Sequence, residues 1–245
     1  MDLAVMDVPC LERLILHGNS VNLPLRIIRA PELKVHGYLD TKAHRFQIGD
    51  NVIKADTEVS PSSEVPSVKI LAVEVNLHIF KEVQMLCSFL RCFPNIEILH
   101  LESAGADEPS DKPDAEFFQL PSPIECVQSH IKEVFLNEFQ GHQCEMAFLK
   151  YLCRRANQMQ KLTLVLRGTM LDSVDKIKVQ LDDLVLPSVA SEACTVLLLG
   201  PAVDLYWSSF YRASDLSIHD PFLSDHENEP FISLKRENKM WIEQT

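Results

Sequence analysis

The sequence lacks the short motifs that many enzymes and metalloproteins carry. None of its nine histidines stands in a His-x-x-x-His or His-Glu-x-x-His spacing, and its seven cysteines form no Cys-x-x-Cys pair. Its seven glycines form neither a Gly-x-Gly-x-x-Gly loop nor a Gly-x-Ser-x-Gly elbow. We therefore expect no enzyme, no metal site and no cofactor, and a surface or half-buried position for each histidine.

Long apolar runs and a basic N-terminal segment are also missing. No stretch approaches the length of a membrane span, and residues 1–7 carry acid where a secretory signal carries base. The cysteines are odd in number and scattered, which is not the pattern of a disulfide framework. The net charge of -12 repels phosphate backbones and anionic lipid. These absences favour a cytoplasmic or nuclear protein with no nucleic-acid or membrane partner.

What the sequence does contain is a repeated pattern of proline, spaced aliphatic residues and charge. In Pro94–Leu101, apolar residues fill the third, sixth and eighth positions of the window. The same frame begins at five other positions, which are Pro9, Pro31, Pro66, Ser129 and Asn157. Among the slots of these windows, His36 is the exception to apolar filling. The pattern predicts stacked repeat units, and therefore a scaffold that binds a partner.

Each window is expected to hold one strand, and the intervals between windows hold the return segments. The intervals are 22, 35, 28, 35 and 28 residues, whereas a unit of one strand and one return segment needs about 20 to 29. The long intervals must contain insertions. The first predicts a strand or hairpin at Phe46–Ile48 and Val52–Ile53 and an exposed loop at Ser60–Glu64. The second predicts a mobile acidic loop at Gly105–Asp114, which we expect to be solvated.

Helical periodicity marks the two shorter return segments. Between Phe80 and Phe93, apolar residues recur at steps of three and four and form one stripe, and Pro94 ends the helix. A second helix is expected over 143–156, with Phe148 and Leu152 buried.

Beyond Leu171 the repeat weakens. Val174–Val179 and Thr195–Leu199 have the composition of strands, and we expect them in a terminal cap with Trp207, Phe210 and Tyr211 packed there. From Asp220 onward, closely spaced proline and acid predict a loose tail.

Two blocks resemble a known protein family. The first resembles the degenerate leucine-rich repeats of plant F-box proteins and consists of Ala30–Leu39, Val65–Leu71 and Cys92–Glu97. The second is similar to the FBD domain that follows such repeats and consists of Ile131–Val134, Phe139–Gly141, Glu145–Leu152, Ala156–Asn157 and Gln160–Thr163.

The resemblance implies an α/β leucine-rich-repeat solenoid of the irregular plant F-box type, with parallel strands, an FBD-like unit and a C-terminal cap. The expected divisions are 1–120 for the repeats, 121–200 for the FBD-like domain, and 201–245 for the cap and loose tail.

Family members are substrate receptors of SCF (cullin-RING) ubiquitin ligases, and this likeness implies ubiquitin-dependent degradation of a bound target. Their F-box precedes the repeats, whereas eight residues stand before Pro9. We therefore expect a substrate-recognition region without its own F-box, which would meet the ligase adaptor only if an F-box exists upstream. The alternative is a free-standing interaction or decoy module with no ligase link.

Outward positions of the strands are the candidate binding residues for an unknown protein target. They are expected to line a shared concave face, and they are Arg13, Ile15, His17, Ile70, Glu74, His100, Glu102, Glu133, Phe135, Asn137, Lys161 and Thr163. Ile15, Ile70 and Phe135 would then be exposed apolar groups among charges, which is typical of a binding patch. Two alternatives stay open: a helix or loop covers this face, or the register slips by one residue and these side chains belong to the core.

Overall fold

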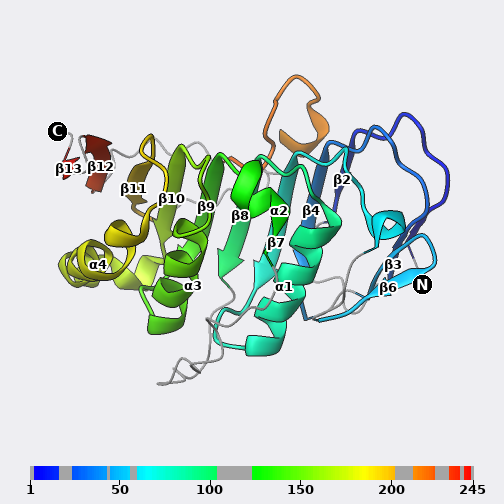
Figure 1. Cartoon of the computed structure of the whole chain (residues 1–245). Helices are drawn as coiled ribbons and strands as arrows, with labels where there is room; N and C mark the ends of the chain where they lie inside the picture. The colour runs from blue at the N-terminus through cyan, green and yellow to red at the C-terminus, as the bar shows by residue number, and fades with distance from the viewer. Residues whose placement is uncertain are drawn as a thin grey trace.

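The computed structural model describes residues 3–16, 24–42, 45–55, 60–103, 123–201, 212–223, 232–237 and 240–243. These residues form two layers. One layer is a nine-stranded sheet, and the other holds helices and a four-stranded sheet (Figure 1). The structure is therefore α/β. None of the helices in these ranges is long and apolar enough to cross a membrane.

The large sheet follows the order of the chain. All six windows of the repeat lead into one of its strands, as the spacing predicts. The strands are β2 (Arg13–Ile15), β4 (Val35–Asp40), β7 (Ile70–Val75), β8 (Ile98–Ser103), β9 (Glu133–Phe139), β10 (Lys161–Leu166), β11 (Thr195–Leu199), β12 (Ile232–Glu237) and β13 (Met240–Glu243). From β2 to β11 each strand is parallel to its neighbour, so the expected parallel strands are confirmed.

The second layer changes character along the chain. At its N-terminal end it is the small sheet of β1 (Leu3–Val5), β3 (Leu25–Ile27), β5 (Phe46–Ile48) and β6 (Asn51–Ile53). The predicted hairpin is the antiparallel pair β5 and β6. Further along, the layer consists of α1 (Phe80–Cys92), α2 (Glu125–Ser129), α3 (Gln143–Cys153) and α4 (Val174–Gln180). Short turns of 3-10 or π helix occupy Pro61–Ser63, Gly168–Ser173, Leu181–Val185 and Leu186–Ser188.

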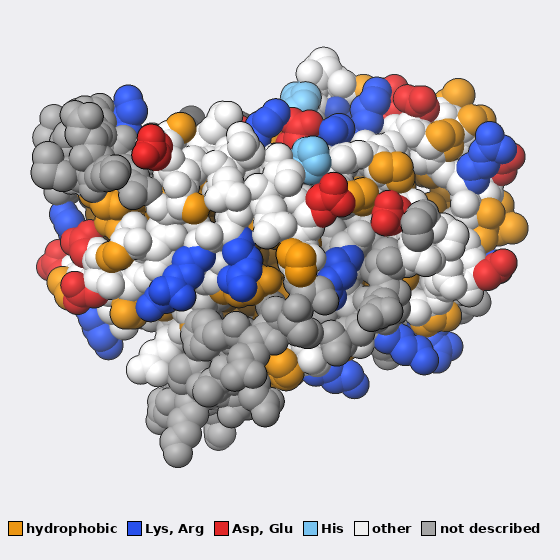
Figure 2. All heavy atoms as spheres, in the orientation of Figure 1, with side chains coloured by type: hydrophobic (Ala, Val, Ile, Leu, Met, Phe, Trp, Pro, Cys, Tyr) orange, Lys and Arg blue, Asp and Glu red, His pale blue; other side chains and the backbone are white. Residues whose placement is uncertain are grey.

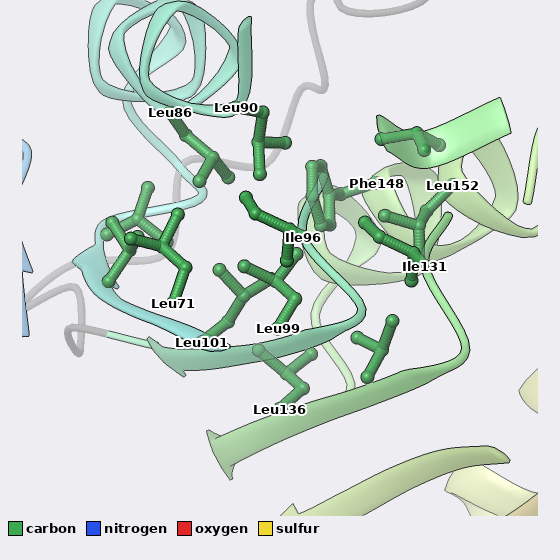
Figure 3. Close-up of a cluster of buried hydrophobic side chains, with 14 of the residues drawn as sticks. Leu71, Leu86, Leu90, Ile96, Leu99, Leu101, Ile131, Leu136, Phe148 and Leu152 are labelled. Carbon is green, nitrogen blue, oxygen red and sulfur yellow. The ribbon is translucent and has the colours of Figure 1, made fainter. Parts of the chain in front are cut away.

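The core lies between the large sheet and these helices. One row of paired strand positions crosses seven strands and is directed into it: Leu14, His36, Leu71, Leu99, Val134, Leu162 and Val196. Figure 3 shows Leu86 and Leu90 of α1 and Phe148 and Leu152 of α3 directed toward this row. Both predicted helices are thus confirmed, and they end within three residues of the predicted ends.

His36 shows how a polar residue fits an apolar slot. Its ring is fully buried between Phe46 and Phe93, at centroid distances of 6.0 and 5.8 Å. Its Nδ1 lies 3.0 Å from the carbonyl oxygen of Leu14 on the neighbouring strand, which gives the buried nitrogen a hydrogen-bond partner. The expectation of a surface or half-buried position is therefore wrong for this histidine.

The segment Val174–Val179 is a helix, and the prediction of a strand there is wrong. Its β-branched residues suggested a strand, but the apolar positions continue at helical steps to Leu181 and Val185. Ile177 and Leu181 are buried, and Ile177 packs so closely on Gly141 that a Cβ there would lie 2.8 Å from its Cγ1. Packing of α4 within the second layer therefore outweighs the intrinsic β propensity of its residues.

The C-terminal region is also more regular than predicted. Strands β12 and β13 lie within the expected loose tail and continue the sheet beyond β11 in antiparallel pairs. Ile232 and Leu234 of β12 are buried. Strand β11 itself was predicted, and β12 covers the edge that this apolar strand would otherwise expose.

A buried carboxylate ties each of the two units that contain α1 and α3 to the strand of the preceding unit. Glu145, in the first turn of α3, accepts hydrogen bonds from the amides of Gln140 and His142, at 3.1 and 2.9 Å. Its other oxygen accepts the Ser103 hydroxyl at the end of β8, at 2.8 Å. Burial raises the pKa of Glu145 above its ordinary value, and these hydrogen bonds partly oppose the shift.

Glu82 repeats this arrangement in α1. One of its oxygens accepts the amide of Asn76 and the hydroxyl of Thr41, both at 2.9 Å. Thr41 directly follows β4, so the bond again joins the end of one strand to the turn after the next strand. The two carboxylates hold neighbouring units together from equivalent positions.

Replacing Glu145 by Ala should destabilise the protein by about 3 kcal/mol, because three donors would lose their acceptor inside the protein. Glu145→Gln should cost less, since its amide oxygen can still accept the main-chain amides. Urea unfolding followed by circular dichroism measures both. Equal losses for the two variants would show that the hydrogen bonds do not hold these units together.

Candidate functional site

The side chains on the sheet face opposite α1 and α3, here called the outer face, form aligned rows. Because the strands are parallel and in register, residues at the same step of each strand become neighbours. One row contains Arg13, Val35, Ile70, Ile98, Glu133, Lys161 and Thr195. Another contains Ile15, Gly37, Ala72, His100, Phe135, Thr163 and Leu197. Glu74, Glu102 and Asn137 continue the pattern.

The predicted binding residues are on this face wherever the structure describes them. His17 lies outside the described residues, and the other candidates occupy the rows above in the predicted register. The alternative of a one-residue slip is therefore wrong. The assignment of a binding role to these residues stays a prediction.

Several of these side chains are covered, however, and the prediction of an exposed apolar patch is wrong. Ile70 and Phe135 are 1% and 5% exposed, while Ile15 is half-buried. The polar residues His100 and Thr163 are buried as well. The other alternative from the sequence, coverage of this face by another segment, accounts for the burial of His100.

The covering segment is residues 212–223, here called the strap, which is drawn in orange at the top of Figure 1. Arg13 of β2 holds the central residues of the strap. The Arg13 guanidinium donates to the carbonyl oxygens of Asp215 and Leu216, at 2.9 and 3.3 Å, and to that of Ile218. These bonds join residues about 200 positions apart in the sequence.

Further along the strap, Asp220 makes a buried contact with His100 of β8. The Asp220 carboxylate lies 2.8 Å from Nε2 of His100, and the two side chains are 3% and 2% exposed. Its other oxygen accepts the amide of Phe222 at 3.0 Å. Burial alone would raise the pKa of Asp220, but the hydrogen bond and the charge of His100 outweigh burial and hold that pKa below its usual value.

Aromatic rings complete the contact. The Phe222 ring meets Tyr38 and His100 edge-on or tilted, at centroid distances of 5.1 and 5.4 Å. On the next strand Phe135 stacks on His100 at 4.5 Å with an angle of 7° between the rings. Lys161 Nζ lies 5.7 Å from the centre of the Phe135 ring, within cation–π range. The rings and the cation thus extend from β4 to β10.

A bulge in β4 brings Tyr38 to this face. The pairing with β7 shifts between His36 and Leu39, so that Leu39 takes the core position opposite Val73. Gly37 lies in the same stretch, and a Cβ on it would stand 2.6 Å from Ala72 Cβ and 2.9 Å from Phe222 Cζ. The strap therefore approaches the backbone more closely than any larger residue at position 37 would allow.

Acidic residues gather at the C-terminal ends of β4, β7 and β8. Burial raises the pKa of Glu74, and the charges of Asp40 and Glu82 add to the shift. Arg13 and Lys161 lie at the opposite ends of their strands. The outer face is therefore acidic at the C-terminal ends of these strands, whereas at the opposite ends the basic Arg13 and Lys161 lie in the same row as the acidic Glu133.

The histidines and cysteines of the described ranges show two kinds of environment. No cluster of three or more His, Cys, Asp and Glu that could hold a metal occurs there. His78 and His142, near the starts of α1 and α3, lie 3.1 Å apart from Nε2 to Nδ1. Burial raises the pKa of Cys92 and of Cys126 to about 12, so these thiols stay protonated near neutral pH.

The sequence analysis identified the face but missed the strap. Asp220 was expected in a loose tail, yet it is buried, and His219 beside it is exposed. No periodic pattern marks the strap, and a single Asp-Pro-Phe triplet is too short a signal. Trp207, Phe210, Tyr211, His226 and the acidic stretch Gly105–Asp114 lie outside the described residues.

Two family models match consecutive parts of the chain. The model described as "FBD-associated F-box protein At5g56370, LRR repeats" matches residues 1–101. The model described as "FBD" matches residues 119–164. No curated protein and no solved structure matches the chain. The two matched parts share one sheet, since β8 pairs with β9 in the same parallel register that joins β7 to β8.

Chemical labelling can test whether the strap covers His100. Diethyl pyrocarbonate acylates accessible neutral imidazoles, so mass spectrometry should find His219 modified and His100 protected in the wild type. In the Asp220→Ala/Phe222→Ala variant, His100 should become reactive. His36 is the matched control, since it is buried on the other side of the sheet and should stay protected in both. Protection of His100 in the variant would contradict the described contact.

The stability of the His78–His142 contact should depend on pH. Burial and then the charge of His142 lower the pKa of His78 below 6.5, so the unfolded chain takes up a proton more readily than the folded one. The stabilisation is complete above about pH 6.5 and is lost as pH falls below it. The free energy of unfolding should therefore fall less in His78→Gln than in the wild type between about pH 7.5 and about pH 5.5. Parallel pH curves would contradict this.

Proposed function

We propose that this chain recognises a protein partner through its outer face. The chain is an LRR/FBD protein, because the repeat model and the FBD model match consecutive parts of it. Recognition would be non-covalent and would need no cofactor. The observation that carries the proposal is the row of His100, Phe135 and Lys161, which combines rings and charge on neighbouring strands. Aromatic side chains such as Phe135 are enriched at protein interfaces.

The finer architecture belongs to the same proposal. The units would form a leucine-rich-repeat solenoid, with the large sheet on its inner side and with β12 and β13 as its cap. Support comes from the parallel register shared by successive strands and from the equivalent carboxylates Glu82 and Glu145. In a solenoid each unit contacts its neighbours, and the strands together present one continuous binding surface.

The biological setting we propose is substrate recognition for an SCF ubiquitin ligase. The repeat model that matches this chain is named for an F-box protein. The outer face would hold the target, and the ligase adaptor would dock on an F-box. Figure 2 shows the opposite, helix-bearing face, on which the coloured basic and acidic side chains are intermixed. A nucleic-acid site would be expected to carry a cluster of basic side chains instead.

Site-specific photo-cross-linking tests this function. A photoreactive amino acid is placed at Glu102 or Asn137 on the outer face, or at Gln128 of α2 as the exposed control. After incubation in extract of the source cells and irradiation, a protein partner should be cross-linked from positions 102 and 137 and not from 128. Cross-links from position 128 alone would place binding on the helix side and overturn the proposal. Recovery of the ligase adaptor by residues 1–245 alone would contradict docking through an F-box.

A further inference from the structure

The strap touches the outer face as a peptide ligand would. Its contacts come from three places: the carbonyl groups near Ile218, the Asp220 carboxylate and the Phe222 ring. Several other residues of the strap face solvent. Leu216 is 68% exposed, and Ser217 and His219 are exposed as well. The main-chain bond from the Ile218 amide to Asp215 is internal to the strap.

Each contact recognises a different chemical group. His100 offers a buried ring nitrogen to a carboxylate, which makes a short charge-assisted bond when the imidazole is protonated. Tyr38 and His100 present ring faces and edges to an aromatic side chain, and Gly37 leaves room beneath it. Arg13 bonds to main-chain carbonyls, which every peptide possesses. The carboxylate and the ring are therefore the groups that give specificity.

The spacing of these two groups is fixed by the strap itself. Pro221 lies between Asp220 and Phe222, is buried, and restricts the backbone through its fixed φ angle. The Phe222 amide also bonds back to the Asp220 carboxylate. The pair is held as a small rigid unit, and this reduces the entropy that binding must offset.

We propose that the outer face over β4, β7 and β8 is a site for an extended segment of a partner protein that carries a carboxylate and, two residues later, an aromatic ring. The strap is the internal occupant of that site, and a partner must displace it. This inference rests on the proposed function, because it names the chemistry of the partner at the same face. Attachment to the chain gives the strap an effective concentration on the order of millimolar, so it weakens binding from outside.

A labelled peptide of residues 213–223 provides the direct test, read by fluorescence polarisation. It should bind the full chain carrying Asp220→Ala/Phe222→Ala, whose strap has lost both specific groups. The wild type should bind it at least about tenfold more weakly, since its own strap competes. Adding His100→Ala to the double variant should remove most of the binding. His130→Ala is the matched control, in the turn before β9, and should leave binding unchanged.

Peptide variants separate the two groups. A peptide with the Asp220→Asn change and one with Phe222→Ala should each bind the strap-released chain more weakly than the native peptide. Failure of the native peptide to bind a released chain that unfolds cooperatively would overturn the proposal. So would equal binding by the wild type and the released chain, or binding that survives His100→Ala. If the double variant does not fold, Asp220→Asn alone releases the charged contact and takes its place.

The outcome is distinguishable from failure of the proposed function. Cross-linking from Glu102 and Asn137 reports any protein on the outer face, whatever its sequence. A cross-linked partner without peptide binding would overturn the site proposed here and leave the proposed function standing. Peptide binding without a cross-linked partner would support an internal ligand on this face and remove the support for recognition of a separate protein.

Discussion

A single register shared by neighbouring parallel strands is the constraint on which this structure depends. Leu71, Leu99 and Val134 lie opposite one another and are buried against α1 and α3. Sliding one strand by a residue would exchange this row for the side chains of the outer face. The burial that fixes the core therefore also aligns His100 with Phe135 on the other side. The geometry of the candidate site is in this sense a product of core packing.

Hydrogen bonds at both ends of the strands reinforce the same register. Before the strands, the amide of the fourth residue of a window bonds to the carbonyl of the equivalent residue in the preceding unit, as Glu97 does with Lys69 and Lys132 with Glu97. After the strands, the carboxylate of Glu145 joins Ser103 to the next turn. Core packing sets the register. In another register, the buried polar groups that make these hydrogen bonds would lose their partners.

The sequence was informative where the pattern was local and periodic. The repeat placed the strands and their outward residues, and apolar spacing placed α1 and α3. It failed at Val174–Val179, where β-branched composition was weighed above helical spacing. It made no prediction about Tyr38, which a bulge in β4 turns to the outer face. The strap could not be predicted from the sequence. The pairs Arg13–Asp215 and His100–Asp220 join residues far apart in the chain, and such contacts produce no periodic sequence pattern.

The bulge in β4 shows how an added residue can change the outer face. One additional residue turns Tyr38 outward, while Leu39 occupies the place in the core that the strand must fill. A single-codon insertion in a strand thus replaces a side chain on the outer face and requires no compensating substitution in the helices. An insertion within a strand can therefore change the chemistry of the outer face while the core row keeps its packing.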